Sequence, residues 1–230
     1  MTSLNSVTKT NTPQKGVGLI QFDLDGTILD TYNQILQAMR YSINEVYHKG
    51  LSDEELMHLV GVPIMEQFNL FVPEDPNGVF DEYVKHEHAN ELAIKPFEGI
   101  VELLEAIKQE GYDMVVVTSK RHKPAETELI ENNLISYFSA VIGADDVVRG
   151  KPDPYPIVYA ADLLGYPLQQ VVYVGDSPYD MQAANAANVF SIGVDWGMFK
   201  KDLLLSYNPN AYVYQPKDVL LQIKHLLPRY

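Results

Sequence analysis

Short apolar runs alternate with helix-patterned stretches along most of the chain. The apolar runs are rich in Val and Ile and have the length of buried strands. They lie at 17–23, 113–119, 140–142, 171–175 and 189–192. Strands that alternate with helices in this way form parallel sheets. The sequence therefore predicts an α/β fold with a Rossmann-like parallel sheet.

The interval between the first two predicted strands is unusually long. It holds roughly 90 residues, far more than one crossover helix and its loops need. Its pattern is helical: 31–47 forms one predicted helix, a capping box at 52–55 begins a second, Pro63 suits the first turn of a third, and 79–92 forms a fourth. Asp30 is expected to be the N-cap of the first helix.

This insert sets the predicted domain boundaries. We expect a core at 17–30 and 95–230, a small α-helical cap at 31–94, and a disordered tail at 1–16. Two chain connections would run side by side between cap and core, and such a pair makes a natural hinge.

The composition limits the possible partners. A formal net charge of −14 excludes a broad surface for nucleic acid or an anionic membrane, because both require a positive patch. The absence of cysteine excludes disulfides, a thiolate nucleophile and a cysteine-bound metal. Because no apolar run has transmembrane length and the first residues lack a secretion signal, we expect a cytoplasmic protein. The sequence does not distinguish a monomer from a dimer.

Polar residues follow several of the predicted strands. The stretch FDLDGTILD places Asp23 and Asp25 after the first strand, although buried ionised carboxylates are costly unless something compensates them. The carboxyl ends of parallel strands are where ligands bind. Carboxylates suit a hard cation such as Mg²⁺, while hydroxyl, N–H and ammonium groups suit phosphate oxygens. We therefore predict a site for a phosphoryl group and Mg²⁺, with further candidates in the loops VTS, GKPDPYP and VGDSPYD: Thr118, Ser119, Lys151, Asp176 and Asp180.

Four motifs occur in a fixed order in these loops: DLDGT, VTS, GKPDP and GDSPYD. In this order the sequence resembles the haloacid dehalogenase superfamily of phosphohydrolases, from residue 17 to about residue 200. It looks most like the branch of phosphoglycolate phosphatases and bacterial pyrophosphatases with an α-helical cap. The resemblance implies a core of this fold with the cap inserted after the first motif.

The resemblance also implies roles for the first motif. Asp23 would be the nucleophile that forms an aspartyl phosphate. Asp25 would protonate the leaving oxygen and then deprotonate water, and its backbone carbonyl would bind Mg²⁺. Gly26 would permit a turn close to the bound phosphate, and Thr27 would hold the Asp25 carboxylate.

The other three motifs would complete the site. The Thr118 hydroxyl and the Ser119 backbone N–H would bind the phosphoryl oxygens, and Lys151 would neutralise the charge between nucleophile and phosphate. Asp176 would bind Mg²⁺. Asp180 would support either the metal or Lys151, and the sequence leaves this choice open.

The expected reaction is hydrolysis of a small phosphorylated metabolite. Asp25 argues against dehalogenation, whose leaving group needs no proton. The cap stretch LVGVPIMEQF is apolar where mutases carry a basic residue, and this also disfavours phosphoglycolate itself. Inorganic pyrophosphate remains an alternative substrate. A non-catalytic module that senses phosphate is a further alternative, but it would require the loss of a motif residue, and none is lost.

Several other polar residues have two interpretations. The basic stretch with Lys120, Arg121 and Lys123 either attracts an anionic substrate or is a solvated helix start. The sequence HEH at 86–88 is interpreted as solvated cap surface, since residues two apart do not share a helix face. Four tyrosines are expected to be packing or rim residues: Tyr155, Tyr159, Tyr173 and Tyr179.

Overall fold

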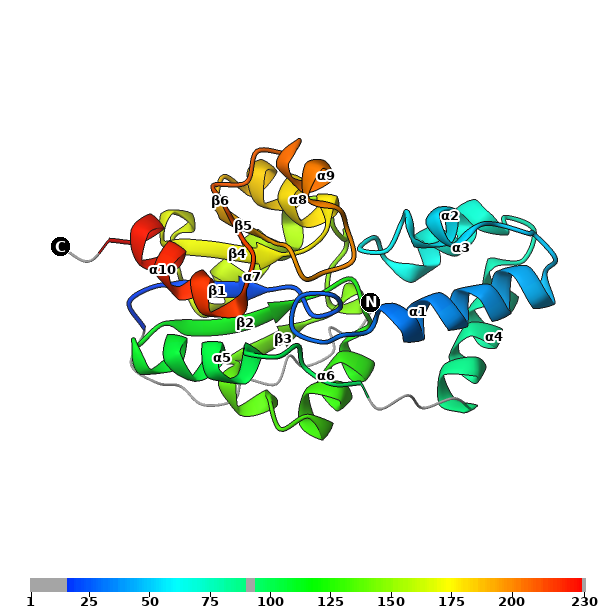
Figure 1. Ribbon diagram of the computed structural model, residues 1–230, viewed down its shortest axis with the longest axis horizontal. Coiled ribbons are helices and arrows are strands. Elements are labelled where there is room, and N and C mark those ends of the chain that lie inside the picture. The colour runs from blue at the N-terminus through cyan, green and yellow to red at the C-terminus, as the bar shows by residue number, and fades with distance from the viewer. Residues whose placement is uncertain (1–15, 90–93, 229–230) are drawn as a thin grey trace.

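A parallel sheet with helices on both faces forms the larger part of the protein. The computed structural model describes residues 16–89 and 94–228, so the predicted tail lies outside the described residues except for Gly16. The described part holds one sheet in the order β3-β2-β1-β4-β5-β6, and every pairing is parallel (Figure 1). The strands are β1 (Leu19–Phe22), β2 (Asp113–Val117), β3 (Ala140–Ile142), β4 (Val171–Gly175), β5 (Phe190–Val194) and β6 (Ala211–Val213). The predicted α/β fold is confirmed.

Helices cover both faces of this sheet. Successive strand residues point to opposite faces, and the apolar side chains on each face pack against helices. Ile20 and Phe22 of β1 pack in one apolar cluster with residues of α5 and α10, whereas Leu19 packs with residues of α7 and α8 on the other face. The helices of this part are α5 (Ile100–Gln109), α6 (His122–Glu131), α7 (Tyr155–Leu164), α8 (Pro178–Ala187), α9 (Lys201–Leu205) and α10 (Pro216–Leu226). Single 3-10 turns lie at Ile135–Tyr137, Ala144–Asp146 and Leu168–Gln170.

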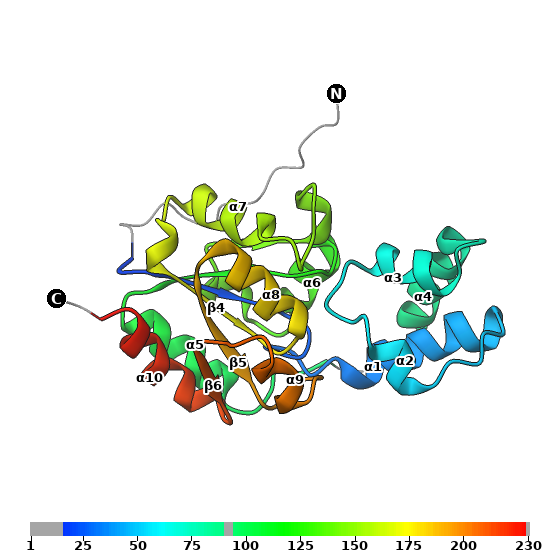
Figure 2. The same cartoon turned by 90° about the horizontal axis from the view of Figure 1, so that it is seen from above.

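Four more helices form a separate lobe beside the sheet (Figures 1 and 2). They are α1 (Tyr32–Met39), which continues as a π-helical segment (Arg40–Val46), α2 (Asp53–Met57), α3 (Ile64–Phe71) and α4 (Pro76–Ala89). Their buried side chains form their own apolar cluster, which includes Met39, Ile43, Leu56, Phe68 and Val79. This cluster supports the predicted cap, although its boundaries at 31 and 94 stay a prediction.

Local signals at the ends of the cap helices were predicted with mixed success. The capping box is present, because Ser52 N–H donates to Glu55 Oε2 at 2.8 Å and Glu55 N–H donates to Ser52 Oγ at 3.3 Å. Asp30 is not the N-cap of α1; Thr31 occupies that position and its side chain makes no capping bond. Asp30 instead donates its backbone N–H to the Lys95 carbonyl at 2.9 Å, which joins the two connections between the lobes.

The remaining differences from the sequence prediction are small. Pro63 is the N-cap residue of α3 and not part of its first turn. The edge strand β6 was not predicted: only Val213 of its three residues is buried, whereas all three residues of β3 are. Among the helices that the structure describes, none combines the length and apolar character that crossing a bilayer requires.

Candidate active site

Asp23 lies directly after β1, the strand at the centre of the sheet, and its side chain is buried. Lys151 Nζ lies 2.9 Å from Asp23 Oδ1 and 2.6 Å from Asp180 Oδ1. The contact with Asp23 is an ion pair without hydrogen-bond geometry, so among the described residues Asp23 Oδ1 has no hydrogen-bond partner. Burial acts to lower the pKa of Lys151, but the carboxylates of Asp180 and Asp23 outweigh it and raise that pKa. Lys151 is therefore a permanent cation beside Asp23.

Asp176 follows β4, the neighbour of β1, and is held by two hydrogen bonds. Thr27 Oγ1 donates to Asp176 Oδ1 at 3.0 Å, and the backbone N–H of Met198 donates to Asp176 Oδ2 at 2.7 Å. The prediction that Thr27 holds Asp25 is therefore wrong: the turn at DGT places the threonine hydroxyl against the adjacent strand end. Gly26 has a positive φ of 80°, and a Cβ there would lie 2.4 Å from Asp176 Oδ2. A phosphate contact of Gly26 stays a prediction.

Asp180 lies in the first turn of α8, and both of its carboxylate oxygens accept hydrogen bonds. Its Oδ2 accepts hydrogen bonds from the backbone N–H of Ser177 at 3.0 Å and from Ser177 Oγ at 2.6 Å. Its Oδ1 accepts from Lys151 Nζ. Of the two roles that the sequence left open, contact with Lys151 is therefore present in the structure.

Tyr173 of β4 is more than the packing residue that the sequence suggested. Its hydroxyl donates to the Val117 carbonyl at 2.9 Å and lies 3.0 Å from Lys151 Nζ and 3.1 Å from Asp180 Oδ1. Tyr173 is thus a further contact that holds the Lys151 ammonium.

The buried carboxylates suit a hard cation. One carboxylate oxygen from each of Asp23, Asp176 and Asp180 lies within 4.8 Å of the others. Burial, together with the charge of Asp180, raises the pKa of Asp23 well above its usual range and that of Asp176 to about 7. Hydrogen bonds from Met198 and Thr27 offset only part of this for Asp176. The mutual repulsion of these buried oxygens fits a divalent cation with oxygen ligands.

Thr118 and Ser119 follow β2 on the other side of β1. The Thr118 side chain is buried, and its Oγ1 accepts from the Lys120 backbone N–H at 3.1 Å while the hydroxyl proton remains available for a ligand. Ser119 Oγ donates to the carbonyl of Gly61, a residue of the cap loop, at 2.5 Å. The Ser119 hydroxyl therefore joins cap to core, and a phosphate contact of its backbone N–H stays a prediction.

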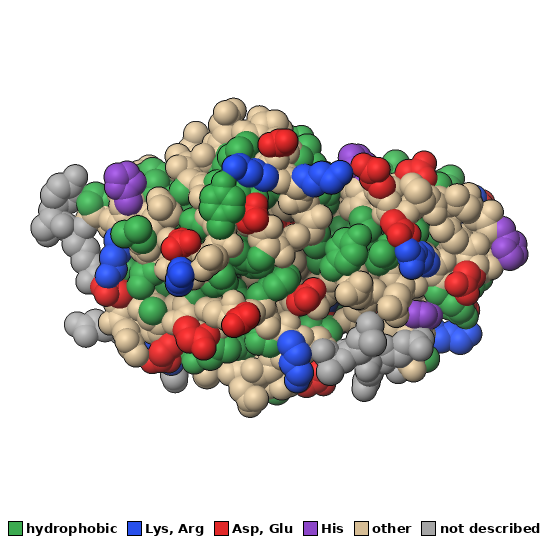
Figure 3. Space-filling view, in the orientation of Figure 1, with side chains coloured by type: hydrophobic (Ala, Val, Ile, Leu, Met, Phe, Trp, Pro, Cys, Tyr) green, Lys and Arg blue, Asp and Glu red, His purple; other side chains and the backbone are tan. Residues whose placement is uncertain are grey.

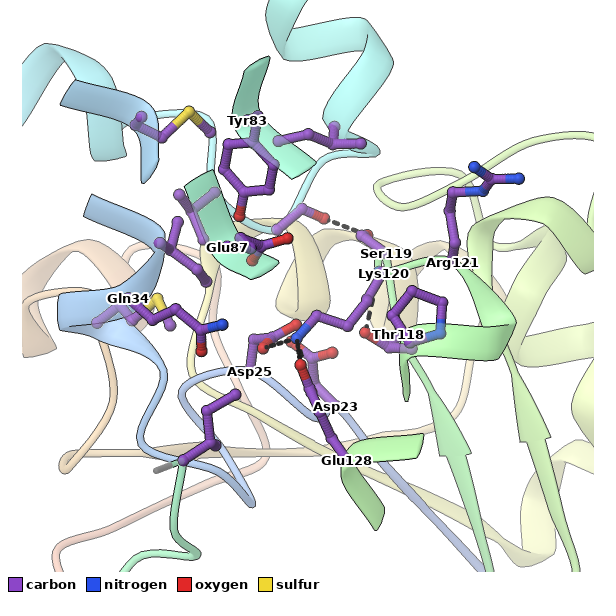
Figure 4. A pocket seen from close by; sticks show the side chains of 18 of the residues that line it. Asp23, Asp25, Gln34, Tyr83, Glu87, Thr118, Ser119, Lys120, Arg121 and Glu128 are labelled. Atoms are coloured by element: carbon purple, nitrogen blue, oxygen red, sulfur yellow. Dashed lines mark hydrogen bonds and ion pairs between the residues drawn. The ribbon is translucent and has the colours of Figure 1, made fainter. Parts of the chain in front are cut away.

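Asp25 has different partners from Asp23. Lys120 Nζ lies 2.9 Å from Asp25 Oδ1 and 2.6 Å and 2.7 Å from the two oxygens of Glu128 (Figure 4). Burial raises the pKa of Glu128 to about 7, although Lys120 counteracts it. Lys120 thus lies inside the site and is not part of a solvated helix start. Glu128 was missed, because nothing in the sequence near it marks the glutamate as a partner of the first motif.

The site opens into a cavity of about 730 Å³ between the cap and the core. Asp23, Asp25, Thr118 and Asp176 line its core side. Its cap side includes Glu87, so the interpretation of 86–88 as solvated surface is wrong for this residue. Both Arg121 and Lys123 lie at the cavity but are exposed.

Known proteins resemble this chain over most of its length. Residues 20–194 match the family model described as haloacid dehalogenase-like hydrolase. A PpaX protein from Caldanaerobacter subterraneus subsp. tengcongensis is 32% identical over 208 residues, which cover 89% of this chain and 94% of that protein. Pyrophosphatase PpaX from Anoxybacillus flavithermus is 28% identical, with coverages of 89% and 95%. The crystal structure of a predicted phosphatase from Clostridium acetobutylicum superposes with a TM-score of 0.81 at 27% identity, covering 92% of this chain and all of that one.

Proposed function

Because the chain belongs to the haloacid dehalogenase-like hydrolase family, we propose that it is a Mg²⁺-dependent phosphatase that acts on a small phosphorylated metabolite through an aspartyl phosphate. One observation carries this proposal. Asp23 is a buried carboxylate at the central strand end, beside the Lys151 cation and the Asp176 carboxylate, and it lines a cavity large enough for a substrate.

In the first step Asp23 is the nucleophile. A carboxylate oxygen of Asp23 attacks phosphorus, the bond from phosphorus to the leaving oxygen breaks, and Asp25 gives that oxygen a proton. Lys151 offsets the negative charge of both the Asp23 carboxylate and the phosphoryl group. The Thr118 hydroxyl has a proton to donate to a phosphoryl oxygen.

In the second step the acyl phosphate is hydrolysed. Asp25, now ionised, takes a proton from a water molecule whose oxygen attacks phosphorus. The bond between phosphorus and the Asp23 oxygen breaks, which releases phosphate and restores both carboxyl groups. The Lys120 ammonium, 2.9 Å from Asp25, orients this carboxylate for both proton transfers.

Mg²⁺ would be held by Asp23 and Asp176, with Asp180 nearby and the Asp25 backbone carbonyl as a further predicted ligand. When bound, the cation supplies positive charge at the phosphoryl oxygens and at the nucleophile. The residues fit such an ion, because their buried carboxylates have more negative charge than Lys151 alone compensates.

Inorganic pyrophosphate is a second candidate substrate. Proteins named pyrophosphatase PpaX match this chain over 89% of its length. The groups around the phosphoryl unit would serve a phosphomonoester and pyrophosphate equally well, so the choice depends on the cap side of the cavity.

The proposal is tested by phosphate release from a panel of phosphorylated metabolites and pyrophosphate, with Mg²⁺ and with EDTA. We expect release that needs Mg²⁺ and that disappears in Asp23→Asn. Release that persists undiminished in metal-stripped protein, or in Asp23→Asn, would contradict the mechanism. Glu54→Gln is a suitable control, because this exposed cap residue lies outside the cavity.

A further inference from the structure

The cap side of the cavity is the part that would surround a leaving group. It is lined by apolar side chains, among them Ile35, Met39, Ile64, Phe80 and Val84. Hydrophobic side chains also gather on the surface at the junction of the two lobes (Figure 3). A wall of this kind favours contact with the carbon skeleton of a ligand over contact with a second phosphate.

The polar groups among these apolar walls are mainly acceptors. Tyr83 and Glu87 project from α4 toward Lys120 and Asp25 (Figure 4), and burial together with the nearby Glu87 carboxylate raises the pKa of Tyr83. An ionised carboxylate accepts hydrogen bonds from several donors. Glu87 thus presents an acceptor with negative charge to the cavity.

Two glutamines add neutral acceptors. Gln67 is buried and donates Nε2 to the Val62 carbonyl at 2.7 Å, but its Oε1 accepts from no residue that the structure describes. Gln34 also lines the cavity, and its buried Oε1 likewise has no partner within the described ranges. A buried acceptor without a donor is unfavourable, and a ligand with N–H or O–H groups would satisfy it.

The cations that line the cavity come from the core. Lys120 lies between Asp25 and Glu128. Arg121 lies 3.6 Å from Asp145, and its guanidinium lies 5.8 Å from the centroid of the Phe80 ring. Lys123 is 77% exposed and paired with Glu126. Lys95 is exposed.

The cap itself brings no positive charge to this cavity. Among the described cap residues that line it, none is Lys or Arg. Residues 90–93, outside the described ranges, read Asn-Glu-Leu-Ala and contain no cation either. Among the described cap residues that line the cavity, Glu87 thus brings the one carboxylate, while Lys95, Lys120, Arg121 and Lys123 line the cavity from the core.

We propose that the preferred substrate is a phosphate monoester of a non-anionic alcohol whose carbon skeleton carries an amine or hydroxyl donor, with the amine preferred. This inference rests on the proposed phosphatase function and specifies its leaving group. The apolar walls contact the skeleton, Glu87 and the two glutamine oxygens accept from the donors, and the Glu87 carboxylate on the cap side repels a leaving group with its own negative charge. Pyrophosphate and phosphoglycolate, whose leaving groups are anionic, become poor substrates.

A series of esters with equal chain length tests this on the wild-type protein. Aminohexyl, hydroxyhexyl and carboxypentyl phosphate differ only in the terminal group, and pyrophosphate is added as a fourth substrate. We expect kcat/KM to be highest for the amine, lower for the hydroxyl, and lower again by about tenfold or more for the carboxylate and pyrophosphate. An activated aryl phosphate reports whether the phosphoryl site works at all.

A substitution at Glu87 tests the origin of the preference. In Glu87→Gln the ratio of kcat/KM for the amine to that for the hydroxyl should fall by about tenfold, mostly through a higher KM for the amine. Asp81→Asn makes the same chemical change on the same helix at an exposed position outside the cavity and should leave that ratio as in the wild type.

The outcomes separate the inference from the function on which it rests. Equal or faster turnover of the carboxylate ester or pyrophosphate would overturn the inference and leave the phosphatase intact. Turnover of the aryl phosphate with none of the hexyl esters would also overturn it. An unchanged ratio in Glu87→Gln would remove Glu87 from the explanation. No phosphate from any substrate, the aryl phosphate included, would contradict the proposed function and the inference together.

Discussion

Asp23 and Asp25 stand two residues apart in one motif and have different surroundings. Asp23 is buried against Lys151 in a network with Asp180 and Tyr173. Asp25 faces the cavity and is paired with Lys120, whose amine also contacts Glu128. The first environment suits a fixed nucleophile, and the second suits a group that exchanges protons with a substrate and with water.

Substitution of each aspartate should therefore have a different result. Asp23→Asn removes the nucleophile, so neither turnover nor a phosphorylated protein is expected. Asp25→Asn keeps the nucleophile but loses general acid and base catalysis, which is worth roughly 10²–10⁴-fold. With an activated aryl phosphate its first step should suffer less than its second, so aspartyl phosphate should accumulate. Intact mass at early times measures the adduct, and an adduct on Asp23→Asn in place of Asp25→Asn would reverse the two assignments.

Gly26 is the second residue whose surroundings make a prediction. Alanine there would have an unfavourable positive φ and would place Cβ against the Asp176 carboxylate. We expect Gly26→Ala to lower Mg²⁺ affinity by roughly 10–100-fold, as changes beside metal ligands do, and to cost about 1–2 kcal/mol of stability. The Mg²⁺ concentration at half-maximal activity is the measurement.

Gly50→Ala is the matched control, since Gly50 also has a positive φ but no atom lies within 4 Å of the added Cβ. It should show a similar loss of stability with wild-type dependence on Mg²⁺. If both variants needed the same Mg²⁺ concentration as the wild type, the close approach of Gly26 to Asp176 would not contribute to Mg²⁺ binding.

The sequence predicted those site residues that belong to short motifs. Asp23, Thr118, Lys151 and Asp176 are brought together because their motifs end neighbouring strands or the loop beside them. The partners Glu128, Glu87 and Tyr173 were missed. Each of them reaches the site through a tertiary contact. The sequence around each one indicates only a surface or packing residue.

At the scale of elements, the buried strands and the cap helices were predicted better than the edge strand and the helix ends. β3 and β4 were predicted with the bounds that the structure has, and all four cap helices exist. The predicted helix at 31–47 is α1 followed by a π-helical segment, a change of hydrogen bonding that apolar spacing does not reveal. β6, a partly exposed strand at the sheet edge, was missed. The N-cap of α1 was predicted at the wrong residue, because Asp30 makes a tertiary contact with Lys95 instead.

Helix α3 offers a test of how the cap chooses substrates. Ile64 at its start lines the cavity, so Ile64→Arg would introduce a cation where the cap has none among its described lining residues. We expect kcat/KM for esters with a carboxylate leaving group to rise by about tenfold relative to that for neutral esters. Leu70→Arg, on the same helix but 67% exposed and outside the cavity, should leave the ranking unchanged.

The result at Ile64 would be read from the ranking and not from absolute rates, since any change in a cavity wall can slow turnover. A uniform loss for every substrate, with the ranking kept, would mean that α3 does not select the leaving group. It would also leave the core groups as the source of whatever preference the wild type shows.

The molecule as a whole repels anions, since its formal net charge is −14. A phosphorylated substrate, as proposed, would therefore be attracted locally by Lys151 and by the proposed cation at the strand ends. Cap and core contact each other around this point through Ser119 with Gly61 and through Tyr179, whose hydroxyl donates to the His58 carbonyl at 3.0 Å. The hydrogen bond from Asp30 to Lys95 joins the two connections between the lobes, and a hinge at these connections stays a prediction.

Cation binding should couple to the stability of the whole protein in a way that depends on pH. Burial and Asp180 raise the pKa of Asp176 to about 7 from a usual value of 3.8. In metal-free protein the folded state thus holds this proton more tightly than the unfolded chain does. The resulting stability is complete below the unfolded pKa and is lost as the pH rises through about 7.

Mg²⁺ binds only the deprotonated carboxylate, so the stabilisation that Mg²⁺ gives should increase as the pH rises. Between about pH 6 and about pH 8, Mg²⁺ affinity should rise about tenfold for one proton released, and the increase in Tm on replacing EDTA with Mg²⁺ should be larger at the higher pH. Thermal unfolding at both pH values measures this, and Asp176→Asn should lose both the Mg²⁺ shift and its pH dependence. An equal Mg²⁺ shift at the two pH values would show that cation binding releases no proton from Asp176, and a wild-type shift in Asp176→Asn would place the cation elsewhere.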